Sequence, residues 1–185
     1  MSYARTMTVK STSEEYIKVM LNELVKLSDI DPRSSDKCLQ YKDEVIRSLH
    51  NLVYDARERG KETISNFQLI LNKHTDEEKK TSFYDVVESL FEDCIKWSRV
   101  IVAFMYIVQV LKISQKDYEK YYNWSIEMVL TKIYPWVREN GGWEHIIQLS
   151  NNRNHFDEVT EQLKKLGTVA LGITGLFALG KWIFN

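Results

Sequence analysis

Glycine and proline are scarce over most of this 185-residue chain. Between Met1 and Asn140 there is a single glycine, Gly60, and the only prolines of the chain are Pro32 and Pro135. A β-rich domain of this size needs many more turn residues to connect its strands. The scarcity therefore predicts an all-α fold, and the length suits one domain with a sizeable core.

An excess of charge of one sign is also missing. Lys and Arg number 25 against 26 Asp and Glu, which gives a formal net charge of -1. Proteins that bind nucleic acid usually carry a basic excess, so no nucleic-acid partner is expected. The two cysteines, Cys38 and Cys94, could form one disulfide. Such a low count fits a reducing compartment better than a secreted scaffold. The first sixteen residues hold no apolar segment of the kind found in secretory signals.

Motifs that carry catalytic or metal chemistry do not stand out. The four histidines have no spacing that suggests a metal site. We find no glycine-rich phosphate loop, nucleophile elbow or carboxylate pair. The sequence therefore predicts no catalytic residues, no metal and no cofactor, and the protein is not expected to be an enzyme.

The most informative segment is FYDVVESLFEDCIKWSR, residues 83–99. Its apolar residues recur at the spacing of one helix face: Phe83, Val86, Val87, Leu90 and Phe91. The next predicted helix, about Trp97 to Ile113, is apolar on every side and shorter than a bilayer requires. We therefore expect this second helix to be buried in the centre of the domain.

Arg99 lies at the start of that apolar helix. A half-buried guanidinium reduces stability unless a carboxylate meets it. The source of that carboxylate is the main functional question that the sequence raises.

Caps and breaks place the other helices. Ser11 or Thr12 is expected to cap a first helix, and a second is expected from about Lys37 to Arg59, ended by Gly60. The segment HTDEEKK, residues 74–80, is predicted as a charged loop before a helix capped by Ser82. Further helices are predicted after Ser114, at PWVREN and from Trp143, with a break at Gly141–Gly142.

The last twenty residues differ in composition from the rest. Four of the seven glycines lie there, and fifteen uncharged residues separate Lys165 from Lys181. Glycine is unfavourable in soluble helices but tolerated in membrane-spanning ones. We therefore predict a helical domain over residues 1–165 and a C-terminal membrane anchor over 166–185; a final helix packed on the domain is the alternative.

Two segments together resemble a known family. Residues 83–99 resemble the first homology motif (BH1) of the Bcl-2 family, and PWVRENGGWEHIIQL, residues 135–149, resembles the second (BH2). The motif residues that carry the resemblance are Trp97, Trp136, Asn140, Gly141, Gly142 and Trp143. The resemblance implies a bundle of about eight helices around one buried central helix, with a hydrophobic groove on its surface.

In that family the groove binds an amphipathic BH3 helix from a partner protein. The resemblance implies that Arg99 pairs with the aspartate of the partner helix, and that Lys96 meets a second acidic residue. The positions expected to line the groove are Phe67, Leu71, Val86, Leu90, Lys96, Arg99, Val102 and Ala103, of which Phe67 and Leu71 are placed by helical pattern alone. Ser98 and Cys94 stand where the family has glycines, which let the ligand helix approach closely. We therefore expect a modest change in selectivity among BH3 helices rather than a loss of binding.

Members of the family that promote cell death carry a functional BH3 motif of their own. The best register in this chain puts apolar residues at Val45, Leu49, Leu52 and Ala56, and the usual Gly-Asp pair then falls on Val53 and Tyr54. Without that aspartate, the helix lacks the charge-assisted bond to another member's groove arginine. The sequence therefore favours a survival factor over a pore-forming killer of the same fold, or an adaptor that has lost BH3 binding.

The expected mechanism is sequestration of BH3 helices from Bax/Bak-like and BH3-only proteins, which prevents permeabilisation of the mitochondrial outer membrane. The resemblance implies a tail-anchored location on that membrane and in the cytoplasm. Whether the tail inserts in the membrane or folds over the groove remains open, as does binding to BH3-like helices of autophagy regulators.

Overall fold

The computed structural model describes residues 2–33, 43–65, 67, 75–152 and 156–183. Within these ranges the chain is helical and contains no strand, which confirms the predicted all-α class. Predictions for Cys38 and Leu71 fall outside the described residues.

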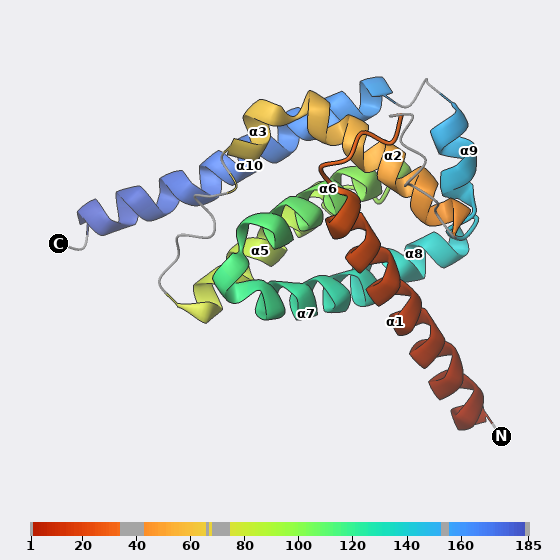
Figure 1. Cartoon of the computed structure of the whole chain (residues 1–185). Helices are drawn as coiled ribbons and strands as arrows, with labels where there is room; N and C mark the ends of the chain where they lie inside the picture. Colours follow the sequence, from red (N-terminus) through yellow and green to blue (C-terminus); the bar gives the residue numbers. More distant parts are fainter. Residues whose placement is uncertain (1, 34–42, 66, 68–74, 153–155, 184–185) are drawn as a thin grey trace.

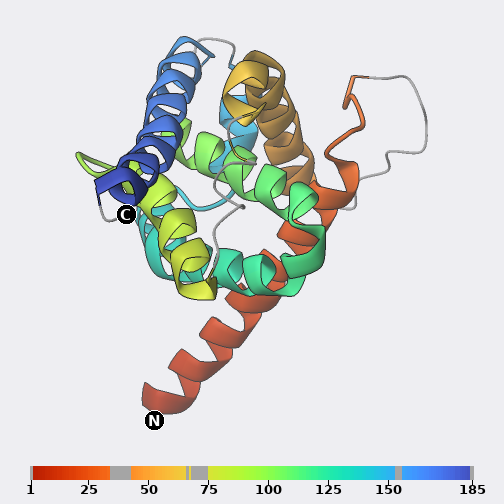
Figure 2. The same cartoon turned by 90° about the vertical axis from the view of Figure 1, so that its left-hand side faces the viewer.

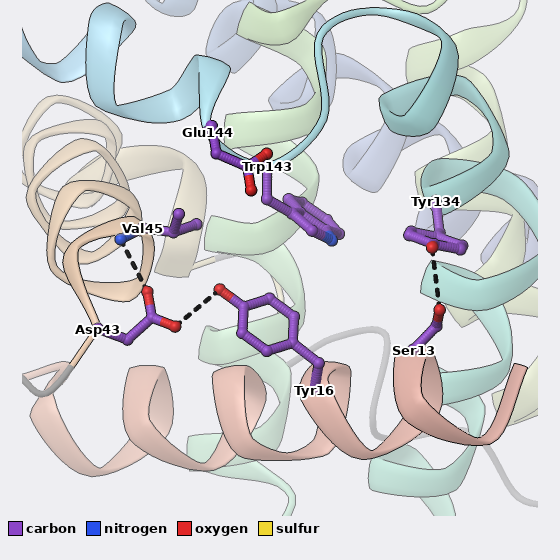
Figure 3. Close-up of a pocket in the computed structure, with 7 residues that line it drawn as sticks. All are labelled: Ser13, Tyr16, Asp43, Val45, Tyr134, Trp143 and Glu144. Carbon is purple, nitrogen blue, oxygen red and sulfur yellow. Dashed lines mark hydrogen bonds between the residues drawn. The ribbon is translucent and has the colours of Figure 1, made fainter. Parts of the chain in front are cut away.

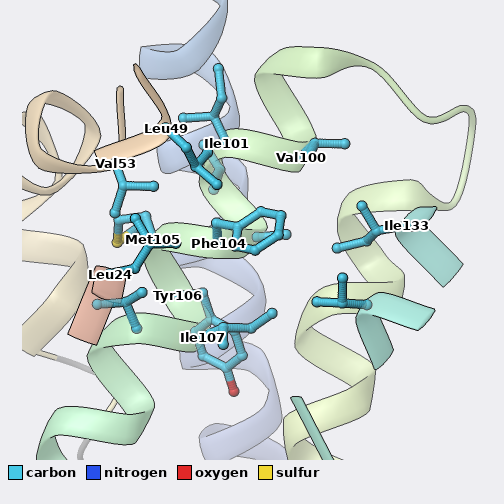
Figure 4. Packing of buried hydrophobic residues seen from close by; sticks show 14 of the residues in the cluster. Leu24, Leu49, Val53, Val100, Ile101, Phe104, Met105, Tyr106, Ile107 and Ile133 are labelled. Atoms are coloured by element: carbon cyan, nitrogen blue, oxygen red, sulfur yellow. The ribbon is translucent and has the colours of Figure 1, made fainter. Parts of the chain in front are cut away.

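Helix α6 (Trp97–Ile113) lies at the centre of the bundle, with the bounds that the apolar run predicts. Every residue from Ser98 to Leu111 is buried. Helices α1 (Ser2–Leu27), α2 (Glu44–Arg59), α5 (Asp76–Phe91), α7 (Tyr118–Met128) and α10 (Phe156–Ile183) pack around it (Figure 1). Figure 4 shows side chains of several elements gathered around α6: Leu24, Leu49, Val53 and Ile133 lie around Phe104 and Met105.

Two predicted helix starts are wrong. Helix α1 begins at Ser2, so Ser11 and Thr12 lie within the helix rather than at its cap. Helix α5 begins at Asp76, because Thr75 and Glu78 form a reciprocal capping box. The predicted loop at 74–80 is therefore in large part the first turns of α5, whose acidic residues suit a helix N-terminus.

The predicted end of the second helix is confirmed. Helix α2 ends at Gly60, whose N–H donates to the carbonyls of Ala56 and Arg57. Its described N-terminus is capped by Asp43, and residues 34–42, where the predicted start lay, are not described. The short helix α3 (Lys61–Ser65) follows directly after Gly60.

A second run of helical segments follows α6 and is bent by 97° from it. A 3₁₀ turn at Gln115–Asp117 leads into α7, a π-helical turn at Val129–Ile133 and then α8 (Tyr134–Glu139). Ser114 makes no side-chain cap at this start. After α8 the chain turns sharply at two glycines into α9 (His145–Asn151).

The C-terminal helix α10 is continuous from Phe156 to Ile183. It packs against α2, α3, α5 and α6, and the side chains of Val159, Leu163 and Leu166 are buried in the same cluster as the core of the other helices. Figure 2, in which α10 is blue, shows it beside α5 and α6. Residues 166–170 of the predicted tail thus belong to a helix that begins within the predicted domain.

Candidate functional site

Arg99 is buried at the N-terminus of the central helix, with only 8% of its surface exposed. Its Nη1 donates to the backbone carbonyl of Cys94 at 2.7 Å, and its Nη2 contacts the Asp93 carboxylate at 3.3 Å. Among the described residues its Nε finds no hydrogen-bond partner. The guanidinium is therefore partly satisfied by the turn that precedes α6.

Asp93 bridges this site to the C-terminal helix. The same carboxylate oxygen that contacts Arg99 lies 3.6 Å from Lys165 Nζ on α10. Lys165, and then Arg99, hold the pKa of the Asp93 carboxyl below its ordinary value. The side chain of Asp93 is itself well exposed, so this carboxylate remains accessible to solvent.

The predicted groove residues on α5 and α6 come together but are covered. Val86, Leu90, Val102 and Ala103 are completely buried. Phe67 is also buried and packs edge-on against Tyr106, at a ring distance of 4.9 Å. These side chains are therefore closed to solvent in the structure, and α10 packs against both α5 and α6.

An open cavity of about 510 Å³ lies at the junction of the two motifs. Trp97 packs edge-on against Trp136 with ring centroids 5.1 Å apart, and stacks on His145 at the same distance. Exposed Lys96 and Glu158 of α10 both contribute to the lining of this cavity. The complete lining is Ile95, Lys96, Trp97, Ser98, Trp136, Asn140, His145 and Glu158.

The glycine pair of the second motif makes the turn between α8 and α9. Gly141 and Gly142 have φ angles of 98° and 70°, which side chains rarely adopt. Asn140 Nδ2 donates to the Trp136 carbonyl at 2.8 Å and so closes the end of α8. The turn places Trp143 in the core, where its ring lies edge-on to Phe104.

Within the described residues, no group of three His, Cys, Asp or Glu side chains could hold a metal ion. No single described helix is long and apolar enough to span a membrane. Helix α6 and the segment Gln115–Glu139 reach that length and hydropathy only when taken together, and they are bent by 97° at their junction.

Sequence reasoning missed the internal partners of Arg99. It placed the matching carboxylate on a partner protein, whereas Asp93, six residues earlier, already contacts the guanidinium. An acidic residue so close before the arginine in the sequence was the available signal. Lys165 offered no such signal, because its contact depends on how α10 packs.

The fold and site define a class: a helical bundle around a buried apolar helix, with an arginine at the start of that helix. Residues 47–143 match the family model described as apoptosis regulator proteins, Bcl-2 family. The chain belongs to the Bcl-2 family, whose members are regulators rather than enzymes.

Individual relatives agree with this assignment. The chain is 31% identical to apoptosis regulator R11 of Xenopus laevis over 113 residues, 57% of this chain and 54% of that protein. It is 35% identical to Bcl-2-like protein 1 of Gallus gallus over 77 residues, 38% of this chain and 33% of the relative. Apoptosis regulator Bcl-2 of Gallus gallus is 27% identical over 108 residues, 55% and 46% of the two chains. The matches thus span about half or less of each relative.

Proposed function

We propose that this protein is a survival factor that binds the BH3 helix of pro-apoptotic relatives in a groove along α5 and α6. The observation that carries the proposal is the environment of the Arg99 guanidinium, which is buried. Among the described residues its Nε has no hydrogen-bond partner, and the carboxylate that it contacts, Asp93, is exposed. A partner aspartate would provide a better-shielded charge pair than Asp93 does.

Binding in this groove requires α10 to move. The apolar side chains of Val86, Leu90 and Val102 are already buried, and α10 packs on the helices that carry them. A partner helix would replace α10 and bury the same apolar surface, so the cost of displacing α10 reduces the apparent affinity. The exposed bridge between Asp93 and Lys165 is the contact that we expect to open first.

Helix α2 supports the survival role over the killer role. Leu49, Leu52 and Ala56 are buried against the bundle rather than offered to a partner. Tyr54 stands where killers carry aspartate, and Asp55 is held at 3.3 Å by Arg33. A helix of this composition lacks the acidic residue that another member's groove would recognise.

The proposed site of action is the mitochondrial outer membrane, where sequestered BH3 helices would not trigger pores. The uncharged stretch between Lys165 and Lys181 is the segment that we propose to enter the membrane once α10 leaves the groove. Fractionation of cells that express the chain with and without residues 166–185 tests this location. Equal membrane association of the two forms would contradict it.

Calorimetry with a panel of synthetic BH3 peptides tests the binding proposal. Arg99→Asp should abolish binding, because it puts a like charge opposite the peptide aspartate. Arg138→Asp makes the same charge change at an exposed position of α8 and should leave affinity unchanged. Circular dichroism of both variants reports whether the fold is kept. Unchanged peptide affinity in folded Arg99→Asp would refute the proposed groove.

The same panel separates the alternatives. An adaptor that has lost BH3 binding would bind no peptide. A killer of the same fold would permeabilise liposomes when a BH3 peptide is added, whereas a survival factor would suppress permeabilisation by a killer relative.

A further inference from the structure

A second cavity, of about 370 Å³, lies away from the Arg99 site (Figure 3). It is formed where α1, the start of α2, α8 and the turn before α9 meet. Its volume is at the low end of the range for small-molecule sites, about 300 to 1,000 Å³. The lining residues are Ser13, Tyr16, Asp43, Val45, Tyr134, Trp143 and Glu144.

The charge of this lining is negative. Asp43 and Glu144 contribute carboxylates from different elements, and the lining contains no lysine, arginine or histidine. Burial, and then the charges of Asp43 and Glu144, raise the pKa of the Tyr16 hydroxyl above its ordinary value. Both carboxylates therefore act on the same space, which favours a cationic ligand.

Aromatic rings form much of the remaining wall. Tyr16, Tyr134 and Trp143 point toward the same space in Figure 3. The rings of Tyr134 and Trp143 are nearly parallel, with an interplanar angle of 20° and centroids 6.4 Å apart. Aromatic faces attract cations, and they do so without requiring hydrogen bonds.

The polar groups of the lining are largely engaged with one another. One oxygen of Asp43 accepts from two backbone N–H groups at the start of α2, and the other accepts from the Tyr16 hydroxyl at 3.0 Å. Ser13 donates to the Tyr134 hydroxyl at 2.9 Å. A primary ammonium would need acceptors for three N–H groups, and Asp43 already accepts three hydrogen bonds, which leaves Glu144 as its main acceptor. A quaternary ammonium has no N–H group, and needs only negative charge and aromatic surface.

We propose that this cavity binds a quaternary ammonium group. The trimethylated nitrogen lies among Tyr16, Tyr134 and Trp143, with the Glu144 carboxylate as its main counter-charge and Asp43 as the second. This site is separate from the groove at Arg99 and does not rest on the proposed function. The negative lining disfavours the phosphate of a choline headgroup, so the ligand is a trimethylated lysine of a partner protein; a choline-type headgroup, which shares the chemistry, is the alternative outcome of the test.

Titration of the full chain with choline chloride, followed by NMR, tests the proposal. The matched control ligand is 3,3-dimethyl-1-butanol, which has the same shape with carbon in place of the charged nitrogen. We expect saturable shifts of the Trp143 indole N–H with choline, and much weaker shifts with the neutral ligand. Equal responses to the two ligands would show that charge plays no part and would overturn the proposal.

Two variants locate the binding. Glu144→Gln keeps the shape of an exposed side chain and should weaken choline binding by roughly threefold to fivefold. Glu139→Gln removes the same charge from an exposed position of α8 outside the lining, and should leave binding unchanged. Equal affinities in the two variants would overturn the assignment to this cavity.

The source of the ligand is then read from two further probes. Phosphocholine carries a phosphate that the Glu144 carboxylate repels, whereas N-acetyl-trimethyl-lysine amide carries no negative charge. Tighter binding of one probe than of choline identifies that source and supports the site. If neither probe shifts the Trp143 indole N–H in a chain that binds BH3 peptides normally, the proposal for this cavity is overturned. The proposed BH3-binding function is then unaffected.

Discussion

Arg99 and Asp93 form an ion pair across the turn that begins the central helix, with Arg99 Nη2 3.3 Å from Asp93 Oδ2. The two partners differ sharply in environment, since Arg99 is buried and 68% of the Asp93 side chain is exposed. The same oxygen of Asp93 also faces Lys165 of α10. The Asp93 carboxylate thus contacts both Arg99 and α10, and in the proposed binding mode it would compete with the partner's acid for Arg99.

Replacing Asp93 by Asn should therefore raise the affinity for BH3 peptides, by about twofold to fivefold. The change frees the Arg99 guanidinium for the peptide and removes a contact that holds α10 in place. Titration calorimetry measures the effect. Glu92→Gln, an adjacent exposed change of equal charge, should leave affinity unchanged. A weaker affinity in Asp93→Asn would mean that Asp93 contributes to the partner site instead.

Much of the fold followed from the sequence because local signals and packing agree there. The apolar run gave α6 its bounds, Gly60 ended α2, and Gly141–Gly142 made a turn that needs positive φ. The start of α5 was wrong because Ser82 lies inside the helix, where burial fixes it, while the capping box sits seven residues earlier at Thr75. A run of acidic residues there suited both a loop and a helix N-terminus.

The candidate site was only partly predictable. The motif strings identified Trp97 and Trp136, but their contact at one cavity was not predicted. Periodicity tells which face of a helix is apolar but not which helix covers it, so the packing of α10 on α5 and α6 could not be derived. The contact of Lys165 with Asp93 was missed for the same reason.

The corrected cap of α5 gives a stability prediction. Thr75→Ala should lower the free energy of unfolding by about 0.5 to 2 kcal/mol, because it removes the acceptor for the Glu78 N–H. Thr81→Ala lies on the exposed face of the same helix and should change stability little. Urea denaturation of both variants provides the comparison. Similar losses in the two would argue against a cap at Thr75.

His50 predicts a pH dependence of stability. Burial lowers the pKa of this imidazole below its ordinary value, against the opposing hydrogen bond to the Leu27 backbone. The unfolded state therefore binds the proton more readily, and the stabilising effect of neutral His50 is present above its unfolded pKa, about 6.5, and lost as pH falls through that value. Unfolding free energies between about pH 5.5 and 7.5 should rise with pH in the wild type. His50→Gln should flatten this rise of the unfolding free energy with pH. If the rise is equally steep in the variant, it comes from the titration of other side chains.

The most direct measurement is a double-mutant cycle between Arg99 and the aspartate of a BH3 peptide. Calorimetry would give the affinities of wild type and Arg99→Gln for a peptide with its aspartate and for the same peptide with asparagine. If the buried guanidinium receives the partner's carboxylate, the coupling energy should be about 1.5 kcal/mol or more. Additive effects, with a coupling within about 0.3 kcal/mol of zero, would contradict the proposed role of Arg99 in partner binding.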